Sequence, residues 1–234
     1  MITLCKAILL GCAILLCATQ ILLGQQGDVP RYETFASPSV LSIPKLNLME
    51  RGFNVELGAN LTPWLTIGGD FSSFSGEGSL APSDLSPGQQ AKLGAVAPLL
   101  PSTMSLSFLY SGSTYTFSAG PQLALRRLKR ITILVRPGLG YFHQTVTMKP
   151  ADSISSVIVN QLLGPGGRTR DTVLFYGFGG GIDVQASRQV AFRLTCDFAH
   201  ANPFRDLLNG ANNTVRISVG PTFRWGRNIA SGTK

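Results

Sequence analysis

The sequence predicts an all-β protein, a closed eight-stranded antiparallel up-and-down barrel that crosses a membrane. Three observations lead to this fold class. Apolar and polar residues alternate in segments of roughly 10 residues, the length that a tilted strand needs to cross the hydrocarbon layer. Short turns alternate with long irregular connections, as the two rims of such a barrel require. The charged residues of these segments fall opposite the apolar rows.

The closing segment, residues 214–225, has the clearest alternation. An apolar row runs from Val215 to Trp225, and the opposite row carries Arg216 and Arg224. This is the period-two pattern of a strand with one apolar and one polar face. In a water-soluble sandwich the apolar face would be buried, whereas in a transmembrane barrel it would meet lipid and the arginines would point into the lumen. The local pattern allows both arrangements, and the rest of the chain favours the barrel.

The other strands are less uniform. Residues 31–41 form a poorly patterned first strand with Pro38, which belongs at an edge or a bulge. Residues 51–61 alternate clearly and are followed by a tight turn at residues 62–64. Trp64 falls at the end of the apolar band, where interfacial aromatic side chains lie. The remaining strands are expected at residues 65–72, 115–125, 131–141, 174–184, 190–198 and 214–225.

The alternation disappears in three long segments, residues 75–113, 149–171 and 200–213. Inserts of this length count against a compact soluble domain but are ordinary for external barrel loops. The connections after the second, fourth and sixth strands are short. We therefore expect long loops at one rim and tight turns at the other, an arrangement that a soluble Greek-key sandwich has no reason to adopt.

Charged side chains on the polar faces should point into the barrel, because each would cost about 2–4 kcal/mol near the midplane of the lipid face. An eight-stranded barrel is only wide enough for side chains to fill, and unpaired buried charges are costly. We therefore expect a lumen plugged by arginine–carboxylate pairs with a little water, rather than an open channel. The expected lumen charges are Glu56, Asp70, Arg126, Arg136, Asp183, Arg193, Asp197, Arg216 and Arg224.

The beginning of the chain is typical of a secretory signal peptide. Lys6 precedes a short apolar run at residues 7–16, whereas a spanning helix would need about 20 apolar residues. We expect a signal peptide at residues 1–26, cleaved between positions 18 and 26. A barrel domain at residues 27–226 and a short C-terminal tail at residues 227–234 would follow. The mature chain is therefore expected to be exported.

Charge and cysteine content exclude several classes of protein. Loss of Lys6 with the signal peptide would lower the formal net charge from +8 to +7. A basic chain can bind nucleic acid, but these basic residues are dispersed and the chain is exported, so we expect no nucleic-acid partner. Cys196 would remain alone in the mature chain, which excludes an intramolecular disulfide and a cysteine-based metal site. Residues 9–12 also resemble a lipoprotein signal, so lipidation stays open.

Several runs of sequence resemble small outer-membrane β-barrel proteins of Gram-negative bacteria. They are GFNVELGANLTPWLTIGGDFSSFSG, YTFSAGPQLAL, FYGFGGGIDVQASRQVAFRLTCDF and VRISVGPTFRWG. They are similar to the transmembrane domain of the outer-membrane protein A superfamily and cover most of the expected mature chain. The resemblance implies an outer-membrane location and an up-and-down barrel. No peptidoglycan-binding segment follows, so the cell-wall anchoring of longer members is not implied.

The most specific part of the resemblance lies in the last strand. Ser218, Gly220, Phe223 and Trp225 match the signal that the barrel assembly machinery reads on the last strand of such proteins. In this chain residues 226–234 follow the signal, whereas many members end at the aromatic residue. The resemblance implies that these four residues guide assembly.

No motif for catalysis is complete. Outer-membrane lipid A deacylases carry a histidine with a serine two positions later, but His200 is followed by Ala201 and Asn202. The glycines of residues 177–181 lack the spacing and the helix of a dinucleotide-binding motif, and Ile182 occupies the place of the third glycine. We therefore expect no catalytic residue, no cofactor and no metal site.

These observations favour a non-enzymatic integral outer-membrane barrel with a structural, adhesive or surface-interaction role through its long external loops. The expected partners are outer-membrane lipid and lipopolysaccharide, the barrel assembly machinery and an unknown extracellular ligand, and the chain is expected to be a monomer. Two other functions stay open, a narrow pore for ions or small solutes and a lipid-modifying enzyme. The structural alternative is a soluble periplasmic β protein.

Overall fold

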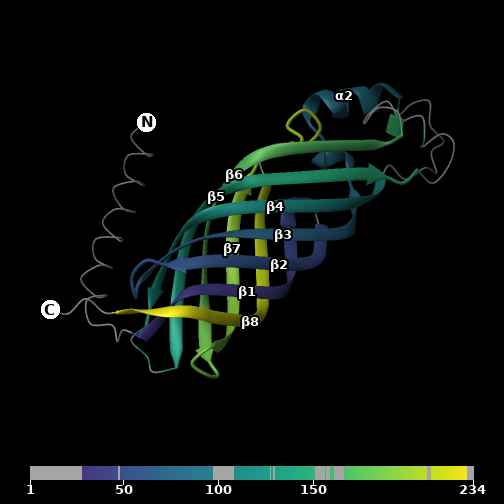
Figure 1. The fold of residues 1–234 in the computed structure, drawn as a ribbon. Helices are drawn as coiled ribbons and strands as arrows, with labels where there is room; N and C mark the ends of the chain where they lie inside the picture. Colours follow the sequence, from purple (N-terminus) through teal and green to yellow (C-terminus); the bar gives the residue numbers. More distant parts are fainter. Residues whose placement is uncertain are drawn as a thin grey trace, which may run out of the picture.

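The computed structural model describes residues 28–46, 48–96, 108–126, 128, 130–150, 156, 159–160, 166–209 and 212–230. These residues form eight antiparallel strands in chain order, and the last strand pairs with the first to close a barrel (Figure 1). The predicted fold class is therefore confirmed. The predicted signal peptide, residues 1–26, lies outside the described residues.

The strands are longer than roughly 10 residues, and the 3-10 helices η1 and η2 and the α-helix α2 lie between them at the rim that carries the long connections. The elements are β1 (Asp28–Ile43), η1 (Pro44–Leu46), β2 (Leu48–Asn60), β3 (Leu65–Leu80), η2 (Pro82–Asp84), α2 (Pro87–Val96), β4 (Phe108–Leu125), β5 (Ile131–Met148), β6 (Arg168–Gln185), β7 (Val190–Ala201) and β8 (Asn212–Ala230).

An apolar belt covers the outside of the barrel. Phe53, Ile133, Phe192 and Phe223 are 49%, 41%, 58% and 49% exposed, so they do not meet in a shared interior. In a soluble sandwich these side chains would form the core. The inverted arrangement, with apolar rows outward and polar rows inward, is that of a barrel in lipid.

Aromatic side chains mark the end of the belt towards the long connections. Phe53 packs near Phe71, and Phe71 stacks on Tyr115, with ring centroids 6.2 and 6.4 Å apart. Beyond this girdle the apolar residues change face. On β5, Tyr141 points outward, whereas residues 142, 146 and 148 are apolar and buried in the interior. Above the girdle the outer face meets water, so the apolar side chains turn inward.

Residues 75–113 were expected to be irregular, and this expectation is wrong at both ends of the segment. β3 continues to Leu80 and β4 begins at Phe108. The expected loop at residues 149–171 is likewise shortened by the early start of β6. Above the girdle the outer row of β3 is Ser73, Ser75, Glu77 and Ser79, and that of β6 is Arg168, Arg170 and Thr172, so these extensions have no apolar row facing outward.

The two rims differ as expected. Tight turns join β2 to β3, β4 to β5 and β6 to β7 at what we call the short-turn rim, and the long connections lie at the opposite, long-loop rim. The link between β1 and β2 at the long-loop rim is also short and contains η1. β8 pairs with β1 as far as Ala230, so part of the expected C-terminal tail belongs to the last strand.

Glycines allow the strands to approach closely where the wall bends. A Cβ atom on Gly68 would lie 2.6 Å from the carbonyl oxygen of Leu57, and one on Gly177 would lie 2.6 Å from that of Phe198. Only glycine fits at such positions. Within the described ranges, no helix is long and apolar enough to cross a membrane.

Candidate functional site

Arg193 of β7 is the centre of the ionic part of the interior. Its guanidinium donates to both carboxylate oxygens of Asp183 on β6, at 2.7 and 3.0 Å. It also reaches Glu33 on β1 at 2.9 Å and Glu56 on β2 at 3.2 Å. The side chain is 1% exposed. Because β7 is not hydrogen-bonded to β1 or β2 in the sheet, this arginine joins walls that face each other across the lumen.

Asp197, also on β7, binds two further arginines. Arg136 of β5 reaches it with Nε at 2.8 Å and Nη2 at 2.6 Å and also pairs with Glu56. Arg216 of β8 reaches Asp197 at 3.1 Å and Asp70 of β3 at 2.6 Å. Since Glu56 belongs to both groups, the ion pairs form one continuous network.

Arg224 and Arg126 lie at the side of the network nearest the short-turn rim. Arg224 donates to Asp183 at 2.6 Å. Arg126 donates to the backbone carbonyl of Pro63 at 2.8 Å, and it makes no ion pair with any described residue. The structure therefore brings eight of the nine expected lumen charges into mutual ion pairs and leaves Arg126 beside them.

Glu33 belongs to this network, and the sequence reasoning missed it. The inward row of β1 mixes Glu33 with the buried apolar Phe35 and Leu41, so β1 has no clean polar face. Gln122 of β4 supports Glu33 with a hydrogen bond of 2.9 Å. We call the following ten side chains the ionic layer: Glu33, Glu56, Asp70, Asp183, Asp197, Arg126, Arg136, Arg193, Arg216 and Arg224.

Carboxylates and arginines are equal in number in the ionic layer, so its formal charges cancel. Removing charges from water is expensive unless each one finds a partner. Neutral side chains contribute further bonds, since Ser118 donates to Asp70 and Asn54 donates to Glu56 at 2.9 Å. The ionic layer therefore fills the lumen from wall to wall.

Towards the long-loop rim the interior is apolar. Phe74 of β3 and Phe142 of β5 are each 2% exposed and belong to one continuous cluster of buried residues. Sequence reasoning did not predict this part of the interior, because it lies above the girdle where the alternation changes face. We call the strand residues of this cluster the apolar layer: Leu41, Ile43, Leu48, Phe74, Leu80, Tyr110, Phe142, Val146, Met148 and Ala201.

Residues from the connections cover the mouth of the barrel at this rim. The segment after β3 is joined to the segment after β7 by an isolated bridge between Leu85 and Leu208. Backbone bonds from Ser86 to Leu207, 2.8 Å, and from Asn209 to Asp84, 3.0 Å, hold the same contact. We call the buried side chains of the connections at this rim the mouth cover: Leu46, Leu85, Leu93, Val159, Phe204, Leu207 and Leu208.

Glu50 lies beside the apolar layer, on β2 beyond the last girdle residue of that strand, Phe53. It is fully buried, and neither carboxylate oxygen has a hydrogen-bond partner among the described residues. Burial raises the pKa of Glu50 to about 7. Glu50 is therefore the one described interior carboxylate that meets no arginine.

A cavity of about 90 Å³ lies between the two halves of the interior. Arg136 and Arg216 line it on one side, and Phe142 and Phe175 line it on the other. The cavity therefore has room for several water molecules. The described residues contain no group of three or more His, Cys, Asp or Glu side chains that could hold a metal ion.

The four expected assembly residues lie on β8 at its seam with β1. Ser218 points inward and accepts a 2.8 Å hydrogen bond from Ser39. Gly220 is also inward, where a Cβ atom would collide with the carbonyl of Ala36. Phe223 and Trp225 point outward and are about half exposed, and the indole of Trp225 lies 4.7 Å from the ring of Tyr32.

The two histidines lie on the outer face at the level of the girdle, not in the lumen. His143 contacts the hydroxyl of Thr172 at 2.6 Å, and His200 contacts the side-chain oxygen of Asn213 at 2.8 Å. His143 also lies near the ring of Tyr115, and His200 lies near that of Tyr176. Among the described residues, neither histidine contacts a serine or an acidic side chain, and the one hydroxyl in contact with a histidine is that of Thr172.

Comparison with solved structures finds outer-membrane barrels. Neisserial surface protein A matches with a TM-score of 0.51 and 9% identity, over 83% of this chain and 96% of that one. OprG from Pseudomonas aeruginosa matches with a TM-score of 0.47 and 8% identity, over 86% and 98%. Ail from Yersinia pestis matches with a TM-score of 0.42 and 12% identity, over 85% and 100%. No protein-family model matches the sequence, and no curated protein matches it.

Fold and interior together define a class of protein. A closed barrel of eight up-and-down strands with an apolar outer belt and an ionic interior is a transmembrane barrel, and its fold is that of small outer-membrane proteins. The likeness at this low identity concerns the fold alone. What the protein does must be inferred from its own interior and rims.

Proposed function

We propose that the protein is a non-enzymatic, monomeric barrel of the outer membrane that is closed to free diffusion and acts through the surface at its long-loop rim. The observation that carries this proposal is the double closure of the interior. The ionic layer joins facing walls below, and the apolar layer with the mouth cover fills the barrel above. A barrel filled in this way offers its rims and its outer face to partners.

The outer face supports contact with the lipids of such a membrane. Its apolar belt matches hydrocarbon, and the aromatic girdle matches the headgroup level. Arg51 is exposed just beyond Phe53, at the level where the phosphates of lipopolysaccharide would lie if the long-loop rim faces outward. Assembly through the last strand is supported by the position of Ser218 and Trp225 at the closing seam.

Membrane fractionation combined with heat-modifiable gel mobility tests the location and the fold. We expect the protein in the outer-membrane fraction, with a mobility that changes on boiling because a folded barrel resists detergent. Recovery in the soluble periplasmic fraction, or one mobility before and after boiling, would contradict the proposal.

A narrow pore is the second candidate, favoured by the cavity between the two halves of the interior. Conductance in planar bilayers separates the two functions. The proposed closed barrel gives no steady current, whereas a pore gives unitary current steps that persist after the protein is repurified. Such current steps would mean that the protein functions in transport and not in the proposed structural role.

Lipid modification is tested by incubating the folded barrel with lipopolysaccharide and measuring the mass of the lipid. We expect an unchanged mass, because His200 contacts an amide oxygen rather than a hydroxyl, and no acidic side chain contacts His143 among the described residues. A loss or gain of an acyl chain that depends on His200 would overturn the non-enzymatic assignment.

A further inference from the structure

β6 extends farther than its neighbour β7. β6 pairs with β5 up to Arg168, but its pairing with β7 begins only at Tyr176, opposite His200. Residues 168–175 therefore have a described strand on one side only. Figure 1 shows β5 and β6 continuing beyond the end of β7 towards the region of α2. Strand edges of this kind expose backbone groups that can pair with another chain. One amide of this edge is already bound, since the backbone N–H of Thr172 donates to the carboxylate of Asp171 at 2.7 Å.

The sequence after β7 explains why the edge stays open. Pro203 has no backbone N–H and cannot continue a ladder. Phe204 follows with a positive φ of 55°, and its side chain is buried in the mouth cover. The backbone N–H of Phe204 donates to the carboxylate of Asp171 at 2.6 Å. The chain is thus turned away from β6 and over the mouth, and Asp171 anchors it there.

The opposite edge of the same protruding sheet is almost fully paired. β3 is hydrogen-bonded to β2 as far as Glu77, and only residues 78–80 extend past the last partner. Lys149 and Glu77 form a 2.6 Å ion pair at this side of the sheet. Within the part of this sheet that the structure describes, the β6 side is therefore the one with an unpaired strand edge long enough to hold a peptide.

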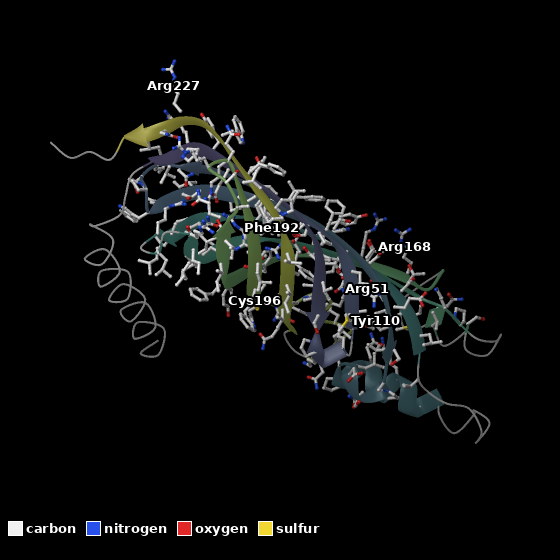
Figure 2. The ribbon with its side chains drawn as sticks, turned by 90° about the horizontal axis from the view of Figure 1, so that it is seen from below. Arg51, Tyr110, Arg168, Phe192, Cys196 and Arg227 are labelled. Carbon is white, nitrogen blue, oxygen red and sulfur yellow. The ribbon has the colours of Figure 1, made fainter. Side chains whose placement is uncertain are left out.

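The side chains along the open edge define what would pair with it. Arg168 and Arg170 are exposed on the outer face, and Figure 2 places Arg168 at the same end of the molecule as Tyr110. Val173 and Phe175 lie on the inner face, partly buried against the apolar cluster. Cross-strand neighbours on one face interact, so an added strand would meet positive charge outside at Arg168 and Arg170 and apolar surface inside at Val173 and Phe175. Thr169 and Asp171 complete the inner row.

We propose that residues 168–175 bind an extended peptide segment of a partner protein, which adds to β6 as a further strand. The segment would carry acidic residues on the face beside the arginines and apolar residues on the alternate face. Backbone hydrogen bonds would supply much of the affinity, and the alternating side chains would supply the specificity. The inference deepens the proposed function, on which it rests, because it names one kind of partner for the long-loop rim.

The test uses the folded barrel in detergent micelles and three labelled eight-residue peptides. The first has glutamate and valine at alternating positions, the second has lysine in place of glutamate, and the third is the first with alternate amides N-methylated. We expect saturable binding of the first peptide alone. N-methylation removes the backbone donors without changing charge, so its effect separates strand addition from simple attraction.

Charge-swapped variants sharpen the test. Arg168→Glu combined with Arg170→Glu should weaken binding of the glutamate peptide by at least about tenfold and create binding of the lysine peptide, because opposite charges across strands attract and like charges repel. Arg51→Glu, on the outer face of β2, is the matched control and should leave binding unchanged. Heat-modifiable mobility verifies that each variant is folded.

Two results overturn the inference: no saturable binding to the folded barrel, or binding that survives N-methylation. Neither result touches the proposed function, which is judged by membrane fractionation and by conductance. Conversely, a protein found in the periplasmic fraction would refute the proposed function whatever the peptides do.

Discussion

The ionic layer and the apolar layer lie in the same barrel but close it through different interactions, ion pairs in the first and apolar packing in the second. In the ionic layer each carboxylate depends on a specific arginine on another strand, and Arg193 alone serves three of them. In the apolar layer the residues are held by packing, which is spread over many contacts. Loss of one member should therefore affect the ionic layer more sharply than the apolar layer.

The largest effect is expected from Arg193→Met. The substitution leaves Glu33, Glu56 and Asp183 with fewer positive partners in a buried site, and breaking a buried pair costs about 3–5 kcal/mol. The free energy of unfolding, measured in urea with lipid vesicles, should fall by that amount. Arg51→Met, at an exposed position, should change it by less than about 0.5 kcal/mol. Equal effects of the two variants would contradict the role given to the ionic layer.

A cavity in the apolar layer should cost somewhat less. Phe142→Ala removes a buried ring beside the cavity, and such truncations cost about 3–5 kcal/mol, with about 3 kcal/mol expected where neighbouring side chains can relax into the space. The same urea titration measures the loss. Since the ionic layer remains intact, the variant should still give no steady current in planar bilayers. Current steps in this variant would mean that the apolar layer, and not the ionic layer, prevents ions from crossing the barrel.

Glu50 provides the smallest of the three effects and depends on pH. Its pKa is about 7 in the folded chain and 4.5 in the absence of burial, so the folded chain holds the proton over this interval. The free energy of unfolding should therefore fall as pH rises from 5 to 7, by about 2 kcal/mol from this group. Glu50→Gln should remove this part of the pH dependence, and identical slopes in variant and wild type would refute it.

The sequence predicted the lower half of the interior far better than the upper half. Within the belt, one face of each strand meets hydrocarbon and the other meets charges, so Arg193, Asp197 and Arg216 stand out against apolar neighbours. Above the girdle the outer face is wet, and the apolar residues move to the inner face, as Phe142 and Met148 do on β5. When the apolar residues change from one face to the other within a strand, the period-two pattern is interrupted and the segment resembles an irregular loop.

Two interior carboxylates illustrate the remaining limit. Glu33 lies on a strand whose inward row also contains Phe35, so the sequence of this strand shows no polar face that would predict a lumen charge. Glu50 precedes the first clear alternation of β2 and is buried beside glycines; a Cβ on Gly112 would lie 2.6 Å from its Oε1. Glu50 has no arginine partner because of how the strands are arranged in the fold, and no local sequence pattern indicates this.

The belt itself can be tested at a native side chain. Cys196 is the one free cysteine of the described residues, and the burial pattern of β7 places it on the outward row with Phe192. A spin label on Cys196, in a chain that begins at residue 27, should collide readily with oxygen dissolved in lipid and rarely with a water-soluble nickel reagent. A label at Thr195→Cys in a Cys196→Ser background, which is buried in the interior, should be shielded from both. A Cys196 label that meets the nickel reagent freely, or meets neither reagent, would contradict the central claim that the apolar rows face lipid.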